Sequence, residues 1–205
     1  MLVPLVRSAK SAAAAPSRAS IAAWTARRRA VAGVAAVGAL ATVIASFLPW
    51  ISAPTVDGGR AVLSGWGGIS GDSQLAGSNL NDALAGAGSY RPGMIGVLFG
   101  AIGILAALGL AVARVRPPGT GGTARPLRIP AALLVLCGVM GAGWGGWRGI
   151  APGDAGVFDP GEAGAAVGPW LTLAAGLVMI GAAVVVFTGR VDPPVRPAGR
   201  AIQPR

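Results

Sequence analysis

The chain has 205 residues, of which 53% are hydrophobic and only 12% are charged, and its mean hydropathy is +0.65. Soluble proteins carry about 25% charged residues, so the composition argues against a water-soluble domain and favours a surface that faces lipid. The net charge of +10 is divided among separate segments rather than gathered on one folded face, which excludes nucleic acid as an expected partner.

Four segments contain no charged residue, and each is long enough to cross a bilayer. About 20 helical residues at a rise of about 1.5 Å each span a hydrocarbon core of about 30 Å. Backbone groups in lipid must bond within their own segment, so we expect helices. These predicted helices cover residues 30–51, 92–113, 129–147 and 167–188.

Residues 1–29 precede the first predicted helix and hold six basic residues and no acid. We expect this tail to be disordered or to lie on the membrane surface. The first helix is the least hydrophobic of the set, and a cleaved signal peptide is the alternative interpretation. The run Arg27-Arg28-Arg29 and the length of the apolar segment favour a retained membrane helix.

The stretch "FLPWIS", residues 47–52, marks the end of this apolar segment. Tryptophan favours the membrane–water interface, where its ring lies in lipid and its N–H reaches water. We therefore predict that the tryptophans at the helix ends anchor the outer interface, together with the arginines at the outer ends of the second and third helices. The predicted interface anchors are Trp50, Trp144, Trp147, Trp170, Arg91 and Arg148.

Two outer loops follow from these boundaries, residues 52–91 and residues 148–166. Within the first loop, "GGRAVLSGWGG" could form a short hairpin or a cap over the helices. The segment Leu80 to Ala85 could form a short helix.

Small residues recur on one face of the second predicted helix, at Gly96, Gly100 and Gly103. Gly141 and Gly145 repeat the four-residue spacing in the third helix. Such spacing lets another helix approach closely. Packing within the bundle is the expected role, and homo-oligomerisation is the alternative.

The distribution of charge predicts the topology. Fourteen of the 17 basic residues fall in the first tail, the connection after the second helix, and the tail 189–205. Because Lys and Arg remain in the cytoplasm, both termini are expected there. We predict an all-α fold: a four-helix transmembrane bundle of residues 30–188 in the plasma (inner) membrane, with up-down-up-down topology.

The sequence offers little chemistry. It has no histidine and one cysteine, Cys137, so zinc sites and disulfides within the chain are excluded. No ionisable residue falls inside the four uncharged segments, which argues against ion coupling and against catalysis within the bilayer. We therefore predict no catalytic residue, no metal and no cofactor.

Two short motifs carry a resemblance to a known family. The Leu48-Pro49-Trp50 ending and Ser64-Gly65-Trp66, with four spans, resemble small four-span membrane proteins of actinobacteria, one branch of which is the tryptophan-associated membrane protein family. The resemblance implies a four-span fold and no defined activity.

These features favour a non-catalytic accessory or structural role, with contacts through the outer loops and the glycine faces. The alternative is a self-associating channel or transporter subunit for a small neutral solute, and an enzyme is a distant third. The expected partners are anionic headgroups on the cytoplasmic side, and a second copy or another membrane protein.

Overall fold

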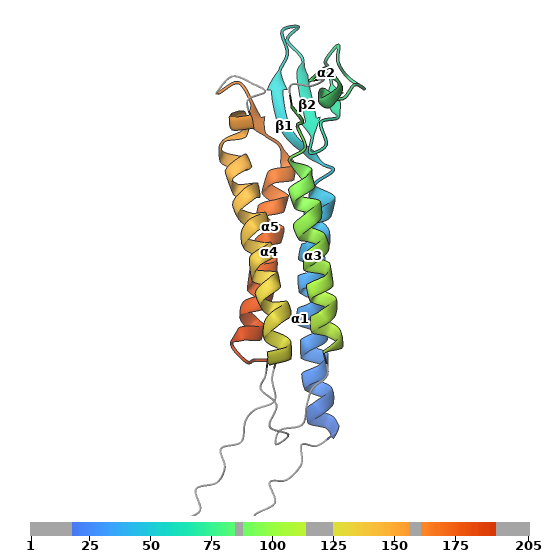
Figure 1. Cartoon of the computed structure of the whole chain (residues 1–205). Coiled ribbons are helices and arrows are strands. Elements are labelled where there is room, and N and C mark those ends of the chain that lie inside the picture. The colour runs from blue at the N-terminus through green and yellow to red at the C-terminus, as the bar shows by residue number, and fades with distance from the viewer. Residues whose placement is uncertain (1–17, 85–87, 114–124, 156–160, 192–205) are drawn as a thin grey trace, which may run out of the picture.

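In the computed structural model, a long bundle of four helices carries a small β-sheet at one end (Figure 1). The structure describes residues 18–84, 88–113, 125–155 and 161–191. Within these ranges, four helices are long and apolar enough to cross a membrane. They are α1 (Arg18–Ala45), α3 (Gly93–Val112), α4 (Arg125–Ile150) and α5 (Val167–Phe187).

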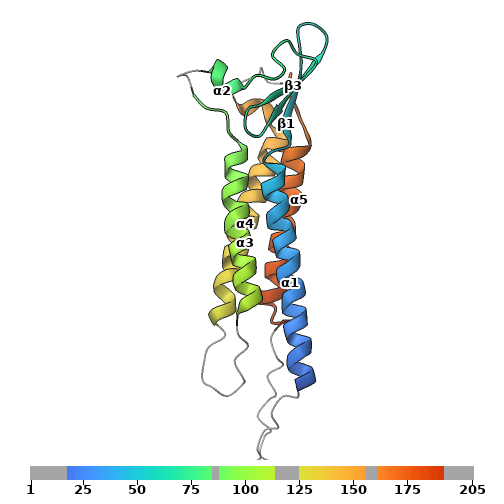
Figure 2. The same ribbon diagram turned by 90° about the vertical axis from the view of Figure 1, so that its right-hand side faces the viewer.

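The four helices form a closed ring. α4 packs most extensively on α5, α1 contacts α3 and α5, and α3 meets α4 along the least extensive of these contacts. The end of α1, the start of α3, the end of α4 and the start of α5 all lie near the sheet (Figures 1 and 2). The core between them consists mainly of alanine, with Leu110, Leu134 and Met179 fully buried. Small residues allow the helix backbones to approach closely.

The first helix differs from its predicted range of 30–51. It begins at Arg18 and ends at Ala45, so the part of the tail 1–29 from Arg18 onward is helical, and residues 1–17 lie outside the described ranges. Arg28 is only 5% exposed. The helix ends early because Pro49 lacks an N–H and disfavours helical geometry at the residue before it.

The other helices begin and end within a few residues of their predicted limits. α3 and α5 lie inside the predicted ranges 92–113 and 167–188, whereas α4 extends the predicted 129–147 at both ends. Residues 189–191 of the predicted tail 189–205 form a turn, and the remainder lies outside the described ranges.

The prediction of an all-α fold is wrong, because the chain also forms a four-stranded antiparallel sheet in the order β3-β2-β1-β4. The strands are β1 (Pro49–Pro54), β2 (Arg60–Ser64), β3 (Ile69–Gly71) and β4 (Gly164–Ala165). The first three strands come from the predicted outer loop 52–91 and the residues just before it. β4 comes from the loop 148–166, so the sheet joins the two loops.

Short helical turns complete this end of the molecule. α2 (Leu80–Ala83) lies within the segment where a short helix was expected, and the 3₁₀ helix η1 (Pro152–Ala155) follows α4. We call the region from Pro49 to Leu84, together with β4, the cap. Its core contains Trp50, Ile51, Leu63 and Ile69, and Tyr90, just before α3, packs in the same cluster.

Candidate functional site

Trp50 lies where the cap meets the bundle, and its side chain is 1% exposed. The prediction that Trp50 is an interface anchor is therefore wrong, because its indole is buried and does not face the membrane–water boundary. Its N–H donates a hydrogen bond of 2.8 Å to the carbonyl oxygen of Ala45, the last residue of α1. The ring thus connects the first strand of the cap to the end of the first helix.

A β-bulge explains how this ring becomes buried. The register between β1 and β2 shifts between Pro49 and Ile51, so Trp50 is an extra residue in its strand. A bulge turns side chains away from strict alternation. As a result, the consecutive residues Trp50 and Ile51 are both buried.

Three glycines give the indole ring and its neighbours their space. A Cβ atom at Gly65 would lie 2.8 Å from the indole nitrogen of Trp50, and one at Gly168 would lie 2.6 Å from the same atom. A Cβ at Gly93, the first residue of α3, would lie 2.5 Å from the carbonyl oxygen of Ser46. These residues (Ser46, Trp50, Gly65, Gly93 and Gly168) form what we call the cap–bundle joint.

The two motifs noted in the sequence meet at this joint. Phe47 and Trp66 stack with ring centroids 5.7 Å apart. The N–H of Gly65 donates to the carbonyl oxygen of Leu48 at 3.2 Å, and Gly93 donates to Gly65 at 2.8 Å. The residues of "FLPW" and "SGW" therefore contact each other, and these contacts stabilise the fold.

Two asparagines fasten the rest of the cap. The side chain of Asn81 donates to the carbonyl oxygen of Trp66 at 3.1 Å and accepts from the N–H of Tyr90 at 2.6 Å. Asn79 caps α2 by accepting from the N–H of Asn81 at 2.9 Å. Burial raises the pKa of the Tyr90 phenol from 10.0 to about 12, although the positive charge of Arg148 acts in the opposite direction.

The other predicted interface anchors lie at the sheet end of α4, α5 and α3. Trp147 and Trp170 are each 46% exposed. Trp144 is half-buried and donates to the carbonyl oxygen of Pro92 at 3.1 Å. Arg91 is exposed, whereas Arg148 is half-buried between Trp144 and Trp147.

The predicted glycine face of α3 lies against α1. A Cβ at Gly100 would lie 2.5 Å from Val43 and 2.8 Å from the carbonyl oxygen of Ala39, and a Cβ at Gly96 or Gly103 would also lie less than 3.0 Å from a neighbouring side chain. In α4, Gly145 is crowded by Pro169 and Leu173, but Gly141 has only Thr42 at 3.9 Å. The structure therefore brings four of the five predicted glycines into close helix contacts.

The predicted glycine faces did not include a second close contact of α4 with α5, at Gly138 and Gly176. A Cβ at Gly138 would lie 2.7 Å from the carbonyl oxygen of Gly176, and one at Gly176 would lie 2.6 Å from that of Gly138. Gly138 and Gly145 are seven residues apart, so they share one face of the helix. The seven-residue spacing of Gly138 and Gly145 therefore indicates the α5-facing side of α4 better than the four-residue spacing of Gly141 and Gly145 does.

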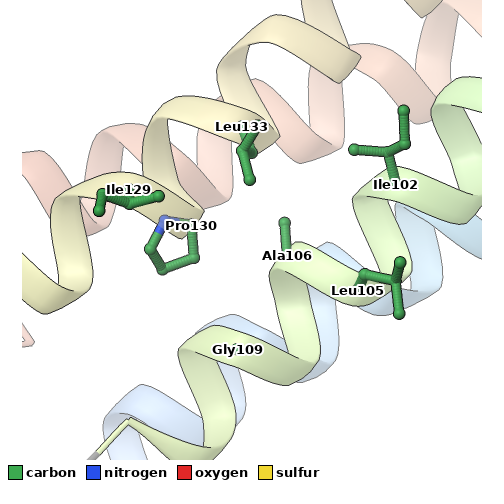
Figure 3. Close-up of a pocket in the computed structure, with 7 residues that line it drawn as sticks. All are labelled: Ile102, Leu105, Ala106, Gly109, Ile129, Pro130 and Leu133. Carbon is green, nitrogen blue, oxygen red and sulfur yellow. The ribbon is translucent and has the colours of Figure 1, made fainter.

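An open apolar groove lies between α3 and α4, with a volume of about 400 Å³. Figure 3 shows Pro130 and Leu133 of α4 facing Ala106 and Ile102 of α3 across it. It lies toward the end of the bundle away from the sheet, near the end of α3 and the start of α4. Its lining residues are Ile102, Leu105, Ala106, Gly109, Ile129, Pro130 and Leu133.

Every side chain that lines the groove is apolar. The buried hydroxyl groups of Thr42, Ser46 and Thr172 each donate to the carbonyl oxygen four residues earlier in the chain. Among the described residues, no three metal-ligating side chains gather, and Cys137 lies fully buried in the core.

Four apolar helices and exposed tryptophans at one end of the bundle decide the class of protein. The chain is a multi-pass membrane protein. No protein-family model matches it, and no curated protein matches it significantly. Its role must therefore be inferred from its own geometry.

Proposed function

We propose that this protein is a non-catalytic accessory or structural component of the plasma (inner) membrane, which presents its cap on the outer side and keeps both termini in the cytoplasm. The sidedness is supported by the positive-inside rule, since the basic residues cluster away from the cap in the sequence. The observation that carries the role is the cap–bundle joint. Its buried ring and close glycine contacts would hold the cap in one orientation on the bundle.

A fixed cap suits recognition more than transport. The large hydrophobic side chains of the cap that remain exposed in the described residues are Val56, at the tip of the β1–β2 hairpin, and Leu75, in the loop after β3. Exposed apolar side chains on a rigid support are common features of protein contact surfaces. We infer that the cap contacts another membrane or extracytoplasmic protein.

The resemblance to small four-span actinobacterial membrane proteins belongs to the same proposal. The motif residues that carry it, Leu48-Pro49-Trp50 and Ser64-Gly65-Trp66, contact one another in the joint. Residues that stabilise a cap could recur in proteins with different partners, so the shared pattern supports a common architecture rather than a common reaction.

A self-associating channel for a small neutral solute is the second candidate. Its predicted contact faces were the glycines of α3 and α4, but Gly96, Gly100 and Gly103 already pack against α1 and Gly145 against α5. A channel would therefore need a different association surface. The exposed apolar faces of the helices are available for such a surface, but lipid covers them equally well.

The test uses a photo-crosslinking amino acid at Val56 in native membranes, with Val37 as the control. Val37 is 67% exposed on α1 and is expected to face lipid. We expect a defined protein adduct from Val56 and none from Val37, and no release of a small neutral solute from liposomes that contain the purified protein. Adducts only to a second copy, combined with solute release, would instead favour the channel.

A further inference from the structure

Arg148 occupies an unusual position near the sheet end of α4. Its guanidinium carbon lies 4.8 Å from the ring centroid of Trp144 and 4.7 Å from that of Trp147. The two indoles themselves meet edge to face, with centroids 5.3 Å apart. An arginine stacked on aromatic rings is held in place by cation–π attraction.

The charge of this arginine has no acceptor in the described part of the chain. Its Nε and Nη1 atoms are buried and have no hydrogen-bond partner, whereas Nη2 is not among the fully buried atoms. The rings attract the cation but supply neither a counter-charge nor an oxygen acceptor. Because an uncompensated buried charge is costly, an anion that approaches from the open side would be stabilised.

The depth of the site indicates which anion this is. The neighbouring Trp147, near the end of α4, and Trp170, near the start of α5, are each half-exposed and lie at the same end of the bundle. Tryptophans of this kind lie at the level of lipid headgroups, where the phosphodiester group is the common anion. A guanidinium also matches phosphate oxygens in geometry and charge.

We propose that Arg148, framed by Trp144 and Trp147, binds the phosphate group of a membrane phospholipid. The inference needs the helices to cross the membrane, but it does not need the accessory role. A failed search for protein partners would therefore leave it unaffected, and a failed lipid experiment would leave the accessory role unaffected.

Native mass spectrometry of the full chain in detergent, titrated with phosphatidylglycerol, tests this site. We expect Arg148→Gln to weaken lipid binding roughly tenfold, the effect of losing one charge-assisted hydrogen bond. Arg91→Gln is the matched control, because Arg91 is exposed at the same end of the bundle and carries the same charge without the aromatic frame. We expect this control to bind like the wild type.

Two further arms identify the chemistry and its source. A galactosyl diacylglycerol, which lacks phosphate, should bind the wild type and Arg148→Gln equally. Competition by inorganic phosphate would show that the phosphate group alone suffices, and its failure to compete would show that the lipid must deliver it. Equal loss in Arg91→Gln and Arg148→Gln, or no loss in either, would overturn the proposal.

Arg148→Lys keeps the test decisive if Arg148→Gln does not fold. Lysine retains the charge but cannot stack as a planar group or offer paired N–H donors. We expect its lipid affinity to fall between those of the wild type and the glutamine variant. Wild-type affinity in a folded lysine variant would contradict a site built on the framed guanidinium.

Discussion

Trp50 shows how one side chain can join two parts of a membrane protein. Its ring fills the junction between the cap and the bundle, and its N–H reaches the end of α1. The bulge turns the ring inward and the glycines leave room for it, so a smaller side chain would leave this space partly unfilled. At the scale of single residues, we therefore expect a substitution of Trp50 to lower the free energy of unfolding more than a substitution of an exposed tryptophan does.

Trp50→Phe should lower the free energy of unfolding by about 1–3 kcal/mol, because it removes a buried hydrogen bond and part of a buried ring. The measurement is thermal unfolding in detergent. Trp170→Phe is the control, since Trp170 is 46% exposed and should change the midpoint little. Equal shifts for the two variants would refute the special role of the joint.

Tyr90 gives the cap a predicted dependence on alkaline pH. Its pKa is raised from 10.0 to about 12 by burial, against the opposing charge of Arg148. The unfolded chain therefore releases the phenol proton before the folded protein does, and stability should be intact below pH 10 and fall between about pH 10 and pH 12. The two-unit shift corresponds to at most about 3 kcal/mol.

Thermal unfolding measured across this pH range tests the effect, with Tyr90→Phe as the comparison. The phenylalanine variant cannot ionise at this position, so its stability should decline less steeply above pH 10. Parallel decline of the two proteins would show that Tyr90 does not control it.

At the scale of elements, glycine positions determine how closely the helices pack. Gly93, Gly96, Gly100 and Gly103 place one face of α3 against α1, and Gly138 meets Gly176 where α4 crosses α5. In lipid, such close packing replaces the hydrophobic driving force that associates helices in water. These glycines are therefore needed for helix packing within one chain, rather than for contacts between two copies.

Gly100→Leu should destabilise the bundle by at least about 2 kcal/mol, because the new side chain must displace the α1 backbone. Gly181→Leu is the matched control, since nothing lies within 4 Å of a Cβ placed there. Thermal unfolding in detergent distinguishes them. If Gly100→Leu changed only the oligomeric state and left the melting midpoint intact, the glycine face would act between chains instead.

At the scale of the whole molecule, the cap and the far end of the bundle should lie on opposite sides of the membrane. Val56, at the hairpin tip, is 105% exposed, and Thr188, just after α5, is also exposed. The native Cys137 is fully buried, so it gives little background in labelling experiments.

Val56→Cys should react with a membrane-impermeant maleimide in intact cells, whereas Thr188→Cys should react only after the membrane is opened. This outcome is expected if the cap faces outward and the termini are cytoplasmic. The reverse pattern would invert the topology while leaving the fold unchanged.

The sequence by itself determined the four spans, because a bilayer requires long uncharged segments whose backbone bonds are internal. It also predicted the glycine face of α3, since helical periodicity places those residues together. It did not predict the sheet, in which Ile51 pairs with Ala165. That pairing joins segments separated by two membrane helices, α3 and α4, so local sequence patterns do not reveal it. Only the tertiary structure decided that Pro49 begins a strand and that Trp50 turns inward, because the space for its ring comes from Gly65, just after β2, and from Gly168 in α5.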